Sequence, residues 1–170
     1  DYESAAEEFQ AYVKKYPDAK RIGTARYRIA ECLFRIERFE DAVAAYRKAL
    51  ERHPDAEQAA LGHYNCARAL QRLKKTKAAA TAFSAAVEKG EGEVRREALL
   101  GDAEARVKLR QFERAAQSYQ ALLEEFPNCS HASDALFSLG WVQARLGHHE
   151  QAAKTFRRFI AKHPDSEDMP

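Results

Sequence analysis

The stretch "RHPDA" at residues 52–56 returns three more times along the chain, almost unchanged. It recurs as "KYPDA" (15–19), "EFPNC" (125–129) and "KHPDS" (162–166). The prolines of these stretches are separated by 37, 73 and 37 positions, and 73 is one interval of 37 plus one of 36. Internal repetition with a period of roughly 20 to 50 residues is typical of solenoids. The sequence therefore predicts a solenoid in which one repeat lacks its proline.

Aromatic and small residues keep the same period. Each aromatic residue of the set follows an alanine by four positions, and the last four also follow an alanine or glycine by sixteen. Small residues let two helix backbones approach closely, and a ring fills the space beside them, so we expect these positions to form the contact within each helix pair. The aromatic residues are Phe9, Tyr46, Phe83, Tyr119 and Phe156, the alanines four before them are Ala5, Ala42, Ala79, Ala115 and Ala152, and the small residues sixteen before are Ala30, Ala67, Ala103 and Gly140.

Each repeat has the pattern of two amphipathic helices. In "TARYRIAECLFRI" (24–36) and "FEDAVAAYRKALERH" (39–53), the apolar residues recur at helical spacing. The two residues between these segments, Glu37 and Arg38, leave room only for an antiparallel hairpin. The sequence therefore predicts an all-α fold built from helix pairs.

The repeated proline marks where each second helix ends. Proline lacks an N–H and disfavours helical geometry in the residue before it, so the helix must stop there. The residue after the proline is Asp18, Asp55, Asn128 or Asp165, and we expect its side chain to cap the next helix. In the repeat without the proline, "KGEGE" (89–93) supplies a glycine that can end the helix instead.

Composition agrees with a compact, helix-rich chain and excludes several other classes of protein. Charged residues make up 32% of the chain and hydrophobic residues 45%, with seven glycines and five prolines, unlike a disordered sequence. No apolar run approaches the roughly 18 residues that span a bilayer. The formal net charge of +2 is too small to predict a polyanionic partner. The chain opens at Asp1 without a leader, so we expect a fragment of a longer protein.

These anchor residues resemble those of the tetratricopeptide repeat family. The family pattern runs from a small residue to Ala-x-x-x-Phe and then to proline, and Ala30, Ala42, Tyr46 and Pro54 follow it in one unit. The resemblance covers essentially the whole chain, because the anchors keep their register from unit to unit. The later units contain Ala67, Ala79 and Phe83, then Ala103, Ala115, Tyr119 and Pro127, and then Gly140, Ala152, Phe156 and Pro164.

The sequence departs from the family pattern in its period and at three positions. The period is 36 to 37, against about 34 in the family, and Asp102, Arg106 and Gln143 stand at usually apolar positions. The longer period and the endings "YPD", "HPD" and "FPN" look most like repeats of bacterial cell-envelope proteins, such as the Tol-system coordinator and the outer-membrane assembly lipoproteins. That resemblance implies the periplasm or cell envelope, whereas the sequence itself leaves localisation open, the cytoplasm included.

The family resemblance implies a right-handed helical-repeat superhelix of about nine antiparallel helices, in a single domain over residues 1–170. The repeats can be bounded by the recurring prolines. The expected parts are the second helix of a first repeat at 1–17, full repeats at about 18–54, 55–91, 92–127 and 128–164, and the start of a further helix at 165–170.

In this family the first helices line a concave groove that binds an extended peptide or a partner helix. Mapped onto this chain, the groove positions include one row that is basic in all four repeats and another that is large and apolar. Such a groove suits an apolar segment that carries acidic residues. The expected groove residues are Tyr27, Glu31, Phe34, Arg35, Tyr64, Asn65, Arg68, Arg72, Leu100, Glu104, Lys108, Phe137, Trp141 and Arg145.

Structural alternatives to binding stay open for several of these residues. Tyr27 and Tyr64 also suit ordinary packing between repeats. Trp141 is the strongest binding candidate, because the equivalent residues in the other repeats are charged and tryptophan is enriched at binding hot spots. The basic row also suits a solvated face near helix C-termini, where cations are favoured by the helix dipole. It comprises Arg35, Arg72, Lys108 and Arg145.

The sequence contains no convincing site for catalysis, a metal or a cofactor, and we expect none of these. "GHHE" (147–150) lacks the H-E-x-x-H spacing of a zinc helix, and His63 with Cys66 supplies only two ligands. "CSH" (129–131) lacks the separate orienting element of a catalytic triad. The three cysteines cannot all pair with one another, so we expect free thiols.

The family's carboxylate clamp is also disfavoured. It needs lysine where Tyr27 or Tyr64 stands and asparagine where Glu31 or Arg68 stands, and only Asn65 comes near.

The function that we expect is a protein-binding scaffold without catalysis or a small-molecule substrate. A structural or end-to-end oligomerisation segment of a longer solenoid is the alternative, and nucleic-acid binding is less favoured because the charge is nearly balanced.

Overall fold

A computed structural model describes residues 1–162, and within that range the chain is helical, with nine α-helices and no strand. The all-α helical-repeat solenoid expected from the sequence is confirmed. The expected helix start at 165–170, with the expected cap Asp165, lies outside the described residues. The helices are α1 (Tyr2–Lys15), α2 (Ile22–Arg35), α3 (Phe39–Arg52), α4 (Ala59–Arg72), α5 (Thr76–Lys89), α6 (Gly92–Lys108), α7 (Phe112–Glu125), α8 (Ala132–Arg145) and α9 (His149–Lys162).

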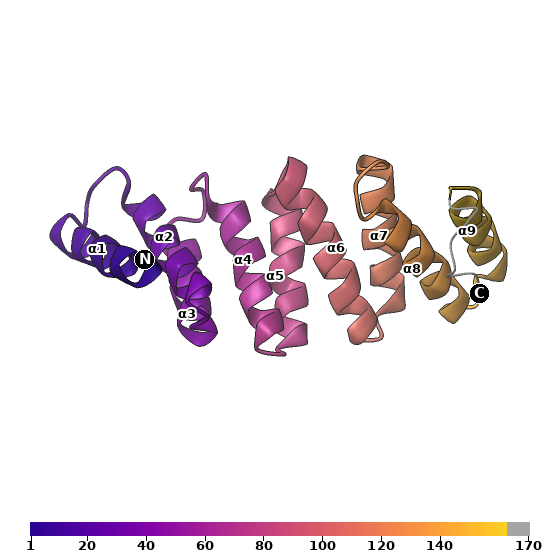
Figure 1. Cartoon of the computed structure of the whole chain (residues 1–170), viewed down its shortest axis with the longest axis horizontal. Helices are drawn as coiled ribbons and strands as arrows, with labels where there is room; N and C mark the ends of the chain where they lie inside the picture. The colour runs from indigo at the N-terminus through magenta and orange to yellow at the C-terminus, as the bar shows by residue number, and fades with distance from the viewer. Residues whose placement is uncertain (163–170) are drawn as a thin grey trace. The chain divides into compact units, whose positions relative to one another are not determined.

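The chain forms two compact units, Asp1–Ala98 and Leu99–Pro170. In the first unit each helix packs on the next, from α1 to α5, and the two first helices α2 and α4 also touch (Figure 1). In the second unit α7 packs on α8 and α8 on α9. In the first unit, the consecutive first helices α2 and α4 therefore contribute to one surface. In the second unit, the first helix α8 contacts both α7 and α9.

The contact within each helix pair is a ring against a small residue, as the sequence predicts. Tyr46 and Phe83 are each 1% exposed, and Ala30 and Ala67 are completely buried. A Cβ built on Gly140 would lie 2.8 Å from the Phe156 ring, so only glycine fits that approach. The sequence pattern therefore locates the core of the helix pairs correctly.

The turn inside each helix pair has the same geometry in all four repeats. Its central residue adopts a left-handed backbone conformation, with φ of 61° at Glu37, 57° at Lys74, 58° at Arg110 and 78° at Gly147. The N–H of that residue and the next N–H both donate to carbonyls of the last helical turn, as with Glu37 to Phe34 (3.1 Å) and Arg38 to Leu33 (3.0 Å). This is a Schellman motif, which favours glycine at its central residue. Three of the four turns have another residue at that position.

The expectation that the residue after the proline caps the next helix is wrong. Helices α1 and α3 do end directly before Tyr16-Pro17 and His53-Pro54, but α2 and α4 begin four residues after Asp18 and Asp55, at Ile22 and Ala59. The residues that precede those first turns, and the one before α8, form no side-chain cap. Instead, the N–H of Ala19 donates to the carbonyl of Tyr16 at 3.2 Å, which makes Pro-Asp the centre of a β-turn.

The polar residues at usually apolar positions are satisfied by hydrogen bonds. Asp102 is 5% exposed and accepts from Ser118 at 2.6 Å and from Arg106 at 3.2 Å. One repeat later, Gln143 accepts from Thr155 at 2.7 Å. Buried polar groups are tolerated when they are paired in this way, so these departures preserve the fold.

We expect Phe83→Ala to destabilise the first unit by about 3–5 kcal/mol, because truncating a buried ring leaves a cavity between α4 and α5. Urea unfolding followed by circular dichroism measures the loss. An unfolding curve indistinguishable from that of the wild type would contradict the packing described above.

We expect Lys74→Gly to stabilise the chain by about 0.5–1 kcal/mol, because glycine adopts the left-handed turn without the strain of a Cβ. The matched control is Gly147→Ala, which introduces that strain and should lower the free energy of unfolding. The interpretation fails if both variants shift the urea midpoint in the same direction.

Candidate functional site

The first helices α2 and α4 carry most of the expected groove residues of the first unit. Because these helices touch, Phe34 on α2 lies under Arg68 of α4, and Glu31 on α2 lines the same pocket as Asn65 of α4. On α4, positions 61, 65, 68 and 72 share one helical face, since residues three and four apart are neighbours. The surface is thus assembled from two consecutive repeats.

Arg68 is held between two aromatic rings at the centre of this surface. Its guanidinium carbon lies 5.2 Å from the centroid of the Phe34 ring and 5.7 Å from that of Tyr64. Arg72 stacks on Phe39 at 4.6 Å, and the Phe34 and Phe39 rings meet edge to face at 5.5 Å. We call these five residues the first-unit arginine–aromatic cluster. Rings fix the cations by cation–π attraction and leave the guanidinium N–H groups free to donate.

The stacking of a terminal arginine on a ring recurs through the chain. Arg35 ends α2 and lies 5.9 Å from the Tyr2 ring at the start of α1, just as Arg72 ends α4 over Phe39. In the second unit, Arg145 ends α8 and lies 5.9 Å from the ring of Phe112, the first residue of α7.

Trp141 completes this arrangement in the second unit. Its ring meets Phe112 edge to face at 5.8 Å and lies 5.5 Å from the Arg145 guanidinium. Trp141 is 41% exposed, so one face of the ring remains accessible. Phe112, Trp141 and Arg145 therefore form a second-unit cluster of the same kind as the first.

Most of these cations have no acidic partner. Arg72 approaches Glu37 at 3.5 Å, but both side chains are more than half exposed, and such pairs contribute little. Among residues 1–162, Arg35, Arg68 and Arg145 form no ion pair with a carboxylate. The cations of the basic row also lie at the C-terminal ends of their helices, where the helix dipole stabilises them. This stabilisation is the structural alternative to a role in binding. The rings add a second, specific restraint that a merely solvated face lacks.

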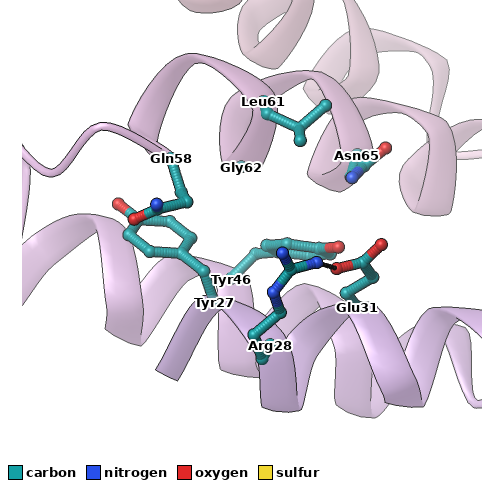
Figure 2. Close-up of a pocket in the computed structure, with 8 residues that line it drawn as sticks. All are labelled: Tyr27, Arg28, Glu31, Tyr46, Gln58, Leu61, Gly62 and Asn65. Carbon is teal, nitrogen blue, oxygen red and sulfur yellow. Dashed lines mark hydrogen bonds and ion pairs between the residues drawn. The ribbon is translucent and has the colours of Figure 1, made fainter. Parts of the chain in front are cut away.

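A small pocket adjoins the first-unit cluster. It has a volume of about 50 Å³ and lies between α2 and α4, with Tyr46 of α3 between the two rows of side chains (Figure 2). Arg28 and Glu31 form an ion pair of 2.6 Å along one side. The Tyr46 ring is 1% exposed, and its hydroxyl oxygen is buried beside the Asn65 side chain. Its lining residues are Tyr27, Arg28, Glu31, Tyr46, Gln58, Leu61, Gly62 and Asn65.

Two of the expected groove residues serve packing. Tyr27 is 3% exposed and its hydroxyl donates to the carbonyl of His53 at 3.0 Å, so its ring is buried between repeats and its polar end is satisfied. Burial also raises the pKa of Tyr27. Phe137 is half-buried against Phe156 and Phe159, at centroid distances of 5.8 and 5.5 Å. These contacts correct the expectation of an open apolar row at those two positions.

The remaining expected residues lie as follows. Tyr64 is half-buried beside Phe83, at 6.0 Å between centroids, with Arg68 over its ring. On α6, Leu100 is half-buried, while Glu104 and Lys108 are exposed. Helix α5 begins with Thr76, where α1, α3 and α7 begin with an aromatic residue.

Sequence reasoning missed the aromatic residues at the start of the second helices. Tyr2, Phe39 and Phe112 stand at intervals of 37 and 73 residues, the same period as the prolines. That period could have identified these aromatic residues. They lie at the first position of a second helix, however, outside the positions associated with the groove. The pocket beside Tyr46 could not be predicted from the sequence, because its size depends on the distance between α2 and α4.

Residues 1–162 contain no group of three or more His, Cys, Asp or Glu side chains that could hold a metal ion. None of the helices described is long and apolar enough to cross a membrane. The three cysteines are free thiols, and burial raises the pKa of Cys66 to about 11. That thiol is protonated near neutral pH and is a poor nucleophile.

Comparison with known proteins agrees with this architecture. The family model described as tetratricopeptide repeat matches residues 1–57, 27–94, 64–128 and 100–167. No curated protein matches the chain.

Solved structures of the same fold share little sequence with this chain. MamA from Desulfovibrio magneticus is 18% identical with a TM-score of 0.71, covering 98% of this chain and 88% of that one. YrrB, a protein described as having an unusual peptide-binding site, is 23% identical with a TM-score of 0.72, over 94% of this chain and 76% of that one. A tetratricopeptide repeat protein from Parabacteroides merdae is 19% identical with a TM-score of 0.74, over 98% of this chain and 62% of that one.

We expect Gly62→Ala to destabilise the first unit by about 1–3 kcal/mol, even though alanine is the better helix former. An added Cβ would lie 2.5 Å from the Tyr27 ring, which is buried and cannot move away without losing its bond to His53. In a Tyr27→Ala background the same substitution should be neutral or stabilising. Equal destabilisation in both backgrounds, measured by urea unfolding, would contradict the contact.

Proposed function

Because the chain belongs to the tetratricopeptide repeat family, we propose that it is a non-catalytic protein-interaction scaffold. It binds an extended peptide or a partner helix on the surface formed by its first helices. Members of this family generally mediate protein–protein interactions. The proposed ligand carries both apolar and acidic residues.

The observation that carries this proposal is the position of Arg68. Its guanidinium lies between the Phe34 and Tyr64 rings and has no acidic partner among the described residues. A carboxylate that reaches it forms charge-assisted hydrogen bonds with a group that is already oriented, so little side-chain entropy is lost on binding. The half-buried rings on either side accept apolar side chains of the same ligand.

The second unit supports the same mode of binding. Trp141 and Arg145 present an exposed ring and an unpaired cation beside Phe112. Tryptophan and arginine are the residues most enriched at binding hot spots. We therefore include Trp141 and Arg145 in the proposed interface, and leave out Tyr27 because it is buried.

We also propose that the protein is located in a bacterial cell envelope. It is supported by the 36- to 37-residue period and by the recurring Pro-Asp and Pro-Asn endings. The proteins with these features that the sequence resembles are scaffolds of the periplasm and outer membrane.

End-to-end association remains the second candidate function, and α1 carries the observation that favours it. Tyr2 is 51% exposed, and Phe9, Tyr12 and Val13 are half-buried. A partly exposed aromatic helix face at one end of a repeat array suits a neighbouring repeat or a second copy. Sedimentation at several concentrations separates the two functions, because only this one predicts a mass that rises with concentration.

We expect a displayed library of random twelve-residue peptides, selected on the immobilised protein, to yield sequences that combine acidic with large apolar residues. Arg68→Gln/Arg72→Gln should weaken the affinity of a selected peptide by about tenfold or more, because two charge-assisted contacts are lost. The affinity should also fall as salt is raised.

The matched control for this experiment is Arg157→Gln/Arg158→Gln. It removes two exposed arginines of α9 and the same formal charge. Equal weakening by both double variants would reduce the effect to net charge and contradict a specific cluster.

A further inference from the structure

A pocket that does not belong to the candidate site lies between α1, α2 and α3. Its volume is about 260 Å³, and we call it the α1–α3 pocket. Its apolar part consists of Val13 on α1, Ile29 on α2, and Ala45 and Ala49 on α3. Val13, Ile29 and Ala45 are only half-buried, so a ligand can reach this apolar surface from solvent.

Three cations from three different helices also line the α1–α3 pocket. They are Lys14 on α1, Arg26 on α2 and Lys48 on α3, and no acidic side chain of the described residues lines the pocket with them. Within residues 1–162, none of the three forms an ion pair with a carboxylate. Burial lowers the pKa of His53, and the charges of Arg26 and Arg52 lower it further, so positive charge also gathers at the end of α3. The pocket is therefore a region of positive potential.

Arg26 stands at a position where the repeats of the second unit bury leucine. It lies four residues before Ala30, and the equivalent residues are Leu99, which is 2% exposed, and Leu136, which is 1% exposed. The Nε atom of Arg26 is buried without a hydrogen-bond partner. Its two terminal nitrogens are not buried and bond to none of the described residues, so they remain open to a ligand. A guanidinium that is partly removed from water without a partner favours the binding of an anion.

The three cations are particular to this pocket and are not part of the repeat pattern. One repeat later, the equivalent positions hold an acidic residue, a histidine and an alanine. Helix packing therefore does not require cations at these positions. The equivalents of Lys14, Arg26 and Lys48 are Glu51, His63 and Ala85.

The size and chemistry of the pocket define the ligand that it fits. A water molecule in the liquid occupies about 30 Å³, so the pocket accommodates about eight or nine groups of that size. An acidic side chain of a peptide is smaller, since glutamate carries only two methylene groups beside its carboxylate, and it would leave most of the apolar surface uncovered. A carboxylate on a longer apolar chain covers that surface and can accept from the Arg26 guanidinium through both oxygens.

We propose that the α1–α3 pocket binds a small organic anion with an apolar body, of the class of a medium-chain carboxylate. The carboxylate accepts from the terminal N–H groups of Arg26, and the Lys14 and Lys48 ammonium groups add attraction from either side. The chain packs on Val13 and Ile29. This site is separate from the surface formed by the first helices, and it does not depend on the function proposed for that surface.

Octanoate is the probe for this site. It is titrated, below its micelle concentration, into the isotope-labelled wild-type chain, and amide NMR spectra follow the binding. We expect saturable binding, with shifts that cluster at the residues of α1, α2 and α3 that line the pocket. Octanol has the same chain length without the charge, and the α-amide of N-acetylglutamic acid has the carboxylate without the long chain. Both should bind about tenfold more weakly than octanoate, or less.

Arg26→Leu is the decisive variant, because leucine occupies the equivalent positions of the second unit and the fold should be retained. It should weaken octanoate binding about tenfold or more and reduce the preference for octanoate over octanol. Lys14→Gln/Lys48→Gln should weaken octanoate binding less, because both ammonium groups are exposed to solvent. The matched control, Arg157→Gln/Arg158→Gln, removes two exposed arginines of the second unit and should change the affinity less than about twofold.

Four results would overturn the inference. The first is that octanoate shows no saturable binding at the pocket, and the second is that Arg26→Leu leaves its affinity unchanged. The third is that octanol or the glutamate derivative binds as tightly as octanoate, because the pocket would then recognise only a chain or only a charge. The fourth is that the control variant weakens octanoate as much as Arg26→Leu does, because the effect would then reflect net charge alone.

Discussion

The structure depends on the packing of an aromatic ring against an alanine or glycine of the paired helix. A Cβ on Gly140 would lie 2.8 Å from the Phe156 ring, and Ala30, Ala67 and Ala103 at the equivalent positions are fully buried. This contact fixes how closely the two helices approach and in which register. The Schellman turn at the end of each first helix then recurs at the same place in every repeat.

The binding surface follows from that register. Because each first helix ends at the same point, its terminal cation falls over the first residue of the preceding second helix, as with Arg72 on Phe39 and Arg145 on Phe112. The helix dipole and the ring both stabilise the cation at that point, but neither neutralises it with a carboxylate. The contacts that hold the repeats together thus leave oriented guanidinium groups on the surface, where Arg72 has only a long, exposed ion pair with Glu37 and Arg145 has none among the described residues.

The sequence predicted more of the fold than of the site. The period gave the helix pairs, their bounds near Pro54 and Pro127, and the buried set around Tyr46 and Phe83. The prediction that Asp18 and Asp55 cap the next helices failed, because a Pro-Asp pair suits a β-turn as well as a helix cap. Within the candidate site, the cations were predicted, but Tyr27 proved to be buried, since the burial of a periodic aromatic depends on how near the next repeat packs. The small pocket beside Tyr46 likewise depends on three helices at once.

The central claim is that Arg68, held between two rings, binds a carboxylate of the ligand. A double-mutant cycle tests it most directly, with Arg68→Gln in the protein and the acidic residue of a selected peptide changed to its amide. We predict that the two changes are strongly coupled, by about 1–2 kcal/mol, because each removes the same charge-assisted contact. Additive losses, with a coupling energy near zero, would show that the carboxylate binds elsewhere and would contradict the account.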